Sequence, residues 1–234
     1  MDQNQVLSEK NTTKPLVPVF LVLEESSMMS DAQVGVLNEV LEESVLSFFA
    51  DPIAFDRFHV EIITYSSSPV VLLPLVCLAD VGTCPGLVRG DELPDYASVF
   101  RKIKQRIDEH VPHQRMKRTV MRPVVFFVCS GQPTDSSWRI AFSELVDITY
   151  KFSPNLVHLG FDEAQKEFMD EIAYSRFGHR QYSLIDSTSV DPKLLGELLF
   201  RVLCGSYLQA RVFDAREDLS LSVEFLVVLD YQCM

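Results

Sequence analysis

VPVFLVLEESSMMS, residues 17–30, begins as an apolar run and ends as a short polar loop. The run from Val17 to Leu23 is rich in β-branched residues, and its length suits a strand that is buried on both faces of a sheet. Such strands belong to parallel sheets whose two faces are covered by helices. The loop Glu24–Ser30 would then lie at the carboxyl end of the strand, where α/β proteins gather their functional residues.

The rest of the chain alternates apolar strands with amphipathic helices. The expected strands cover residues 17–23, 58–65, 70–75, 124–128, 156–161 and 182–185, and the expected helices cover 37–48, 99–107, 138–150, 163–174 and 191–202. Three serines separate strands 58–65 and 70–75, which predicts a hairpin whose second strand is an antiparallel edge strand. This order predicts a three-layer, Rossmann-like α/β fold with a mostly parallel central sheet and helices on both faces.

The chain divides into three segments in this interpretation. Residues 1–16 are a flexible polar leader, residues 17–213 form one domain, and residues 214–234 are a C-terminal extension with β character. Within the extension, residues 219–230 are apolar on both faces in their second half. An exposed strand of this kind has to be covered, so we expect it to join its own sheet or to pair with another chain.

Composition excludes several functional classes. A net charge of −12 argues against nucleic-acid binding, and the basic run Arg115–Arg118 is expected to be a solvated turn. No apolar run reaches the roughly 18 residues that span a bilayer. The leader contains no apolar segment typical of a signal peptide, and the five cysteines show no C-x-x-C spacing. These features predict a cytoplasmic protein with no membrane span.

Four segments carry a resemblance to a known family. Residues Pro18–Ser30 resemble the first strand and loop of von Willebrand factor A domains, where the loop reads D-x-S-x-S and starts a metal-ion-dependent adhesion site. Val36–Glu43 resembles the following helix, and Asp51–Leu75 resembles the second strand with its hairpin. Val124–Asp135 resembles a strand that usually ends in T-D-G-x-P-T-D. The whole set, roughly Pro18–Tyr207, most resembles the TerY-like, bacterial tellurium-resistance-associated branch.

The metal ligands of that family are altered at several positions here. Glu24 stands at the first aspartate and Ser26 matches the first serine, whereas Met28 replaces the second serine with a soft thioether. Pro94 falls at the threonine position, and Ser130 replaces the aspartate of the third loop. Mg²⁺ prefers oxygen ligands in octahedral geometry, so the resemblance implies a degenerate site with no bound metal or other cofactor.

The predicted function is a non-enzymatic protein-binding or scaffold module. Its predicted partner-binding face comprises Glu24, Ser26, Met28, Met29, Pro94, Asp95, Tyr96, Ser130, Gln132 and Asp135. Methionine and tyrosine are common at protein interfaces, although Met29 is expected to pack beneath its loop. The resemblance implies a bacterial stress-response or signalling assembly, in which the partner would be a protein kinase or a metal-dependent phosphatase.

Two other functions remain open at this point. A divalent-metal-dependent adhesion-type module would hold Mg²⁺ or Mn²⁺ with Glu24, Ser26 and Asp95, together with Asp135 and waters. A serine hydrolase would use Ser130, but the G-x-S-x-G motif that permits a nucleophile at a strand end is absent. The adhesion-like tripeptide Arg89–Asp91 is interpreted as a polar turn.

Overall fold

The computed structural model describes residues 15–50, 57–133, 136–162, 164–175 and 181–193. The predicted leader up to residue 14, the strand at 219–230, most of the helix at 191–202 and the site residue Asp135 lie outside these ranges. The division of the chain into leader, domain and extension therefore stays a prediction.

A six-stranded sheet forms the centre of the fold. Its strands are β1 (Val17–Glu24), β2 (Phe58–Tyr65), β3 (Pro69–Cys77), β4 (Val124–Cys129), β5 (Asn155–Phe161) and β6 (Gln181–Ile185). They are ordered β3-β2-β1-β4-β5-β6, and only the β2–β3 pair is antiparallel. The mostly parallel sheet with one antiparallel edge strand is thus confirmed.

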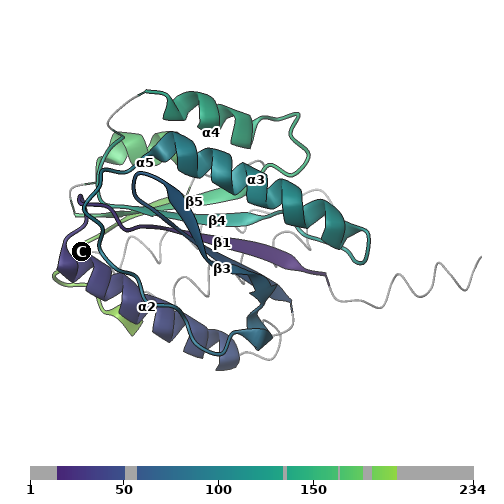
Figure 1. Cartoon of the computed structure of the whole chain (residues 1–234), viewed down its shortest axis with the longest axis horizontal. Helices are drawn as coiled ribbons and strands as arrows, with labels where there is room; N and C mark the ends of the chain where they lie inside the picture. The colour runs from purple at the N-terminus through teal and green to yellow at the C-terminus, as the bar shows by residue number, and fades with distance from the viewer. Residues whose placement is uncertain (1–14, 51–56, 134–135, 163, 176–180, 194–234) are drawn as a thin grey trace, which may run out of the picture.

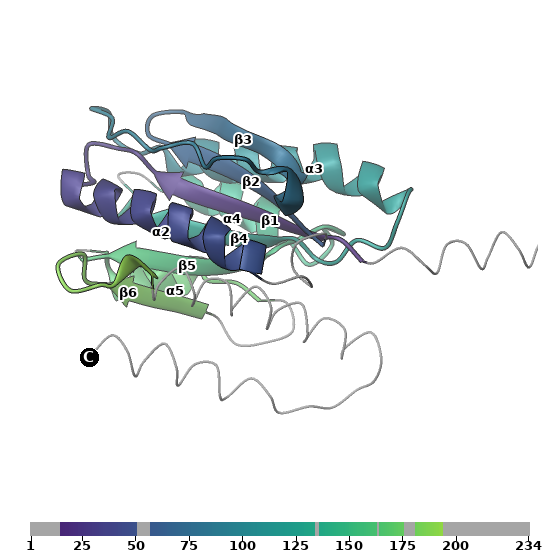
Figure 2. The same ribbon diagram turned by 90° about the horizontal axis from the view of Figure 1, so that it is seen from below.

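Helices cover both faces of this sheet, which confirms the three-layer arrangement. They are α2 (Asp31–Ala50), α3 (Tyr96–Arg115), α4 (Trp138–Val146) and α5 (Lys166–Ile172), and a 3₁₀ turn, η1 (Leu78–Asp80), follows β3. Figure 1 shows α2 on one face of the sheet and α3, α4 and α5 on the other. Figure 2, seen from below, shows α2 in front of the sheet. No helix in the described ranges is both long and apolar enough to cross a bilayer.

Strand β1 contributes to two hydrophobic cores because its side chains alternate between the two faces. Val17 and Val19 pack with Leu37 of α2 on one face, and Phe20 packs with Ile103 of α3 on the other. All five side chains are buried. This double burial explains why β1 is a continuous apolar run.

The helices differ from their predicted bounds for local reasons. Helix α4 ends at Val146 instead of Tyr150, because the Asp147 carboxylate accepts hydrogen bonds from the amide and hydroxyl of Thr149 and forms a turn. The last predicted helix does start where expected. The Asp191 carboxylate accepts a 3.0 Å hydrogen bond from the Lys193 amide, as an N-cap does.

Candidate functional site

Glu24 closes β1 and joins two loops at the carboxyl edge of the sheet. The side chain is completely buried. One carboxylate oxygen accepts a hydrogen bond from the Ser26 hydroxyl, and the other accepts a 2.8 Å bond from the Ser130 amide, which follows β4. The Ser130 hydroxyl is buried nearby but makes no hydrogen bond of standard geometry. Glu24 thereby links the first loop (residues 25–30) to the third loop (residues 130–137, described except for 134–135).

The environment of Glu24 favours the protonated carboxyl more than water does. Burial raises the pKa of Glu24, and the hydrogen bonds from Ser26 and Ser130 oppose part of this effect. Among the described residues, hydrogen bonds and not a cation stabilise the carboxylate. The site holds one buried acidic group without a countercharge among the described residues.

The first loop places its two methionines in opposite directions. The Ser26 hydroxyl accepts a 3.0 Å bond from the Met28 amide, and the Ser26 carbonyl accepts a 3.1 Å bond from the Met29 amide. Met29 is 1% exposed, which confirms that it packs beneath the loop, whereas Met28 is 47% exposed. The Met28 methyl group lies over Gly131, where an added Cβ would approach it to 3.1 Å. Met28 therefore covers the third loop and faces solvent.

A second loop, residues 81–95, holds the first loop in place. The Arg89 guanidinium donates to the carbonyls of Met29 at 2.6 Å and of Ser27 at 3.2 Å. The Gly90 amide donates to the Glu25 carbonyl at 2.5 Å, and an added Cβ on Gly90 would lie 2.7 Å from the same oxygen. The Arg89–Asp91 tripeptide is therefore part of a structural contact, and glycine is required at its centre.

The second loop is itself fixed to α2 and to the first loop. The Asn38 side chain of α2 makes two bonds with the backbone of Leu87, one donated at 3.1 Å and one accepted at 2.7 Å. The Glu25 carboxylate accepts a 3.0 Å bond from the Val88 amide. These contacts give the two loops one defined arrangement.

Three predicted site residues at the junction of the second loop and α3 do not offer free groups to a ligand. Both carboxylate oxygens of Asp95 accept hydrogen bonds from Ser98, at 3.0 Å from its amide and 2.5 Å from its hydroxyl, so Asp95 caps α3. Pro94 and Tyr96 are buried. They support the loop from below, and the exposed member of the predicted face in the third loop is Gln132.

Among the described residues, Ser130 has no hydrogen-bonded base of the kind that a nucleophilic serine needs. His158, the nearest histidine along the sheet, lies 3.1 Å from the Cys129 sulfur through Nε2 and 3.3 Å from the Met169 carbonyl through Nδ1. Burial lowers the pKa of His158 to about 3 and raises the pKa of the Cys129 thiol. The lowered pKa makes His158 a weak base, and its two ring nitrogens face Cys129 and Met169, so His158 does not activate Ser130.

The described donor groups do not fit a hard divalent cation. Mg²⁺ takes about six oxygen ligands and usually one or two carboxylates. In the described ranges, no three His, Cys, Asp or Glu side chains are arranged to hold a metal. Glu24 already accepts a hydrogen bond on each oxygen, and Asp95 faces its helix.

Three exposed apolar side chains lie on the adjoining loops of this edge. Met28, Val88 and Leu93 are 47%, 76% and 54% exposed, and we call them the edge patch. The backbone bond from Ser27 to the Glu92 carbonyl, 2.8 Å long, holds the first loop beside Leu93. Sequence reasoning missed Val88 and Leu93, because the loop containing them carries no periodic pattern.

Comparison with known proteins identifies the fold and nothing narrower. No protein-family model matches the sequence, and no curated protein sequence matches it either. Among solved structures, the von Willebrand factor type A protein from Catenulispora acidiphila matches with a TM-score of 0.59 at 11% identity, over 83% of this chain and 43% of that one. This chain therefore spans less than half of that relative.

Two further matches are metal-bound proteins. The manganese-loaded TRAP protein of Plasmodium vivax matches with a TM-score of 0.51 at 12% identity, over 77% of this chain and 71% of that one. The mussel byssus proximal thread matrix protein 1 with a zinc-occupied MIDAS motif matches with a TM-score of 0.51 at 13% identity, over 81% and 46%. Together with the strand order of the sheet, these similarities show that the chain has the fold of von Willebrand factor A domains.

Proposed function

We propose that this chain is a non-enzymatic protein-binding module that contacts its partner through the edge patch without a metal ion. The observation that carries the proposal is the bonding of Glu24. Its two oxygens accept hydrogen bonds from Ser26 and Ser130, so donors of the protein itself hold the carboxylate in place. The apolar side chains beside it are held on loops that the Arg89 and Asn38 contacts fix, so little ordering entropy opposes binding there.

A metal titration tests the first half of this proposal. We expect neither Mg²⁺ nor Mn²⁺ to raise the melting temperature, and EDTA to leave it unchanged. Calorimetric binding tighter than about 100 μM, equivalent to roughly 5.5 kcal/mol, would instead support the alternative adhesion-type module with Glu24, Ser26 and Asp95 as ligands.

The partner belongs to the proposal as well. The TerY-like resemblance supports a bacterial stress-response or signalling assembly in the cytoplasm, with a protein kinase or a metal-dependent phosphatase as the bound protein. The free cysteines Cys84 and Cys129 are compatible with a reducing compartment. An affinity purification from the native cell, with quantitative mass spectrometry, would identify the partner.

Variants of the edge patch test where that partner binds. We expect Met28→Glu combined with Val88→Glu to reduce partner recovery at least tenfold, because both side chains are exposed and would place charge in an apolar contact. Ile148→Glu is the matched control, since Ile148 is 74% exposed and follows the far end of α4, outside the first and second loops. Equal recovery with the double variant and with wild type would exclude the edge patch. Loss of the partner only on truncation after Ala215 would assign binding to the C-terminal extension.

A further inference from the structure

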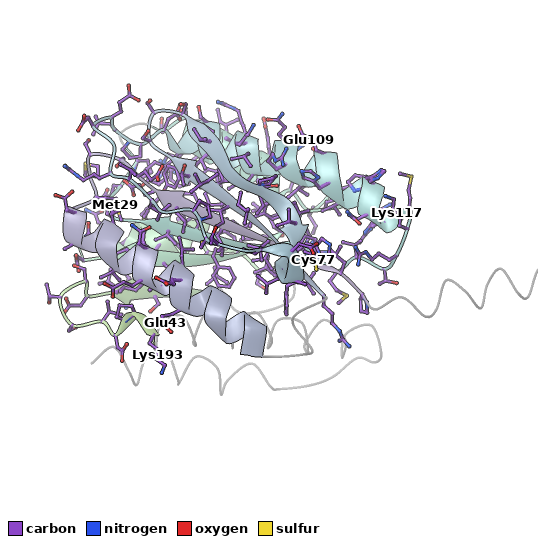
Figure 3. The ribbon with its side chains drawn as sticks, turned by 60° about the horizontal axis from the view of Figure 1, so that its bottom comes forward. Met29, Glu43, Cys77, Glu109, Lys117 and Lys193 are labelled. Atoms are coloured by element: carbon purple, nitrogen blue, oxygen red, sulfur yellow. The ribbon has the colours of Figure 1, made fainter. Side chains whose placement is uncertain are left out.

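Cations gather at the end of the molecule opposite the edge patch. Arg115 is the last residue of α3, Met116 and Lys117 follow it, and Lys151 lies in the loop that precedes β5. Both loops lead into parallel strands, so they lie at the amino edge of the sheet. Figure 3 shows Lys117 and Met29 at opposite ends of the molecule. We call Arg115, Met116, Lys117 and Lys151 the basic platform.

Two cations of the basic platform converge on one aromatic ring. The Arg115 guanidinium lies 5.2 Å from the centre of the Phe152 ring, and the Lys151 ammonium lies 5.7 Å from it. Arg115, Lys117 and Lys151 are exposed. The cation–π contacts hold the positive charges of Arg115 and Lys151 near each other. Because like charges repel, an anion bound between them would stabilise this arrangement.

No carboxylate among the described residues neutralises these three cations. Other basic side chains of the molecule do have such partners: Lys104 pairs with Asp108 and Arg139 with Glu171. The ion pairs found in the described ranges leave Arg115, Lys117 and Lys151 without a carboxylate within 4.0 Å.

Two acidic groups on the neighbouring elements are already engaged. Asp108 accepts a 2.8 Å hydrogen bond from the Tyr150 hydroxyl in addition to its lysine, and Asp147 accepts from Thr149. Behind the platform, further positive charge is present in the side chain of Arg118, which lies 3.3 Å from the His59 ring. In a chain of net charge −12, the described residues at this end are locally positive.

We propose that the basic platform binds an acidic peptide segment of a partner protein. Clustered Asp or Glu carboxylates pair with Arg115, Lys117 and Lys151, and an apolar side chain of the segment contacts Met116, which is 70% exposed. A short segment meets only the platform. A nucleic-acid duplex or a membrane extends over a wider area and also meets the acidic remainder of the chain, which repels it.

A blocked, fluorescein-labelled peptide of six glutamates and two leucines tests the proposal with the full chain, by fluorescence anisotropy. We expect saturable binding below 1 mM that weakens about tenfold in the triple variant Arg115→Glu, Lys117→Glu, Lys151→Glu. The control carries the same change of net charge at other exposed cations, Arg101→Glu, Lys166→Glu and Lys193→Glu, and should bind within about twofold of wild type. Circular dichroism verifies that both variants fold.

Four outcomes would overturn the proposal. The first two are no binding of the peptide at 1 mM and equal weakening of binding in the two triple variants. The third is tighter binding to a single-stranded oligonucleotide or to phosphatidylserine vesicles than to the peptide. The fourth is concentration-dependent self-association, measured by sedimentation, that the platform variant abolishes. The last would identify the occupant as a second copy of the chain.

Discussion

Replacing Glu24 tests whether this edge of the sheet holds a countercharge. Glu24→Gln keeps the shape of the side chain and removes its charge. The amide oxygen can still accept from the Ser130 amide, and the amide nitrogen can donate to the Ser26 hydroxyl oxygen. Because burial raises the pKa of Glu24, the ionised side chain destabilises the fold near pH 7, so the neutral amide offsets any weakening of its hydrogen bonds.

The expected magnitudes follow from the hydrogen bonds. Glu24→Ala leaves the Ser26 hydroxyl and the Ser130 amide without their acceptor in a buried site, where each unsatisfied group costs about 1–3 kcal/mol. We expect Glu24→Ala to lower the free energy of unfolding by about 2–4 kcal/mol. Glu24→Gln should stay within about 1 kcal/mol of wild type, as should the surface control Glu39→Gln.

Urea unfolding followed by circular dichroism measures these differences, with and without EDTA. The pH gives a second readout. The folded chain binds the Glu24 proton more tightly than the unfolded chain does, so this contribution is favourable at low pH and is lost as the pH rises through the raised pKa. The stability of Glu24→Gln relative to wild type should therefore decrease as the pH falls, because only the wild-type side chain gains a proton. If Glu24→Gln costs as much as Glu24→Ala, the carboxylate charge is needed, and the metal-free interpretation is refuted.

Two further substitutions test the loop contacts and the buried histidine. Gly90→Ala should cost about 1–3 kcal/mol, because the added Cβ meets the Glu25 carbonyl, whereas Gly82→Ala meets nothing within 4 Å and should be nearly neutral in the same urea experiment. Burial lowers the pKa of His158 to about 3, so the unfolded chain binds a proton that the folded chain does not, and stability should fall as the pH drops from about 6.5 towards that value. His158→Gln should flatten this pH dependence, and an unchanged slope would show that His158 titrates normally.

The fold was predictable because buried parallel strands leave a strong pattern. Val17–Leu23 and Val124–Val128 are apolar throughout, and the helices between such strands carry apolar residues at helical spacing. The burial of Met29 was also predictable, since one of two adjacent loop methionines has to point inwards. The ends of the helices were less predictable, because the turn that ends α4 depends on local hydrogen bonding between Asp147 and Thr149.

The site was harder to predict because its contacts join distant segments. Arg89 binds carbonyls about sixty residues earlier in the chain, and no local pattern indicates such a pairing. A local pattern does indicate that Asp95 caps a helix. Asp95 immediately precedes α3 and lies three residues before Ser98, whose amide it accepts a hydrogen bond from. The same holds for Ser30 and Gln33, whose reciprocal hydrogen bonds form a capping box at the start of α2.

The two proposed surfaces differ in their physical basis, so salt concentration should separate them. Binding at the basic platform depends on exposed charges, which are screened beyond about 8 Å at 0.15 M salt and beyond about 3 Å at 1 M. Binding at the edge patch depends on burial of Met28, Val88 and Leu93, which salt does not weaken and sulfate strengthens. A partner that dissociates between 0.05 and 0.5 M NaCl and is insensitive to Met28→Glu would be bound through the platform. A partner retained at 0.5 M NaCl and lost on Met28→Glu would be bound through the edge patch, and retention in both conditions would exclude both surfaces for that partner.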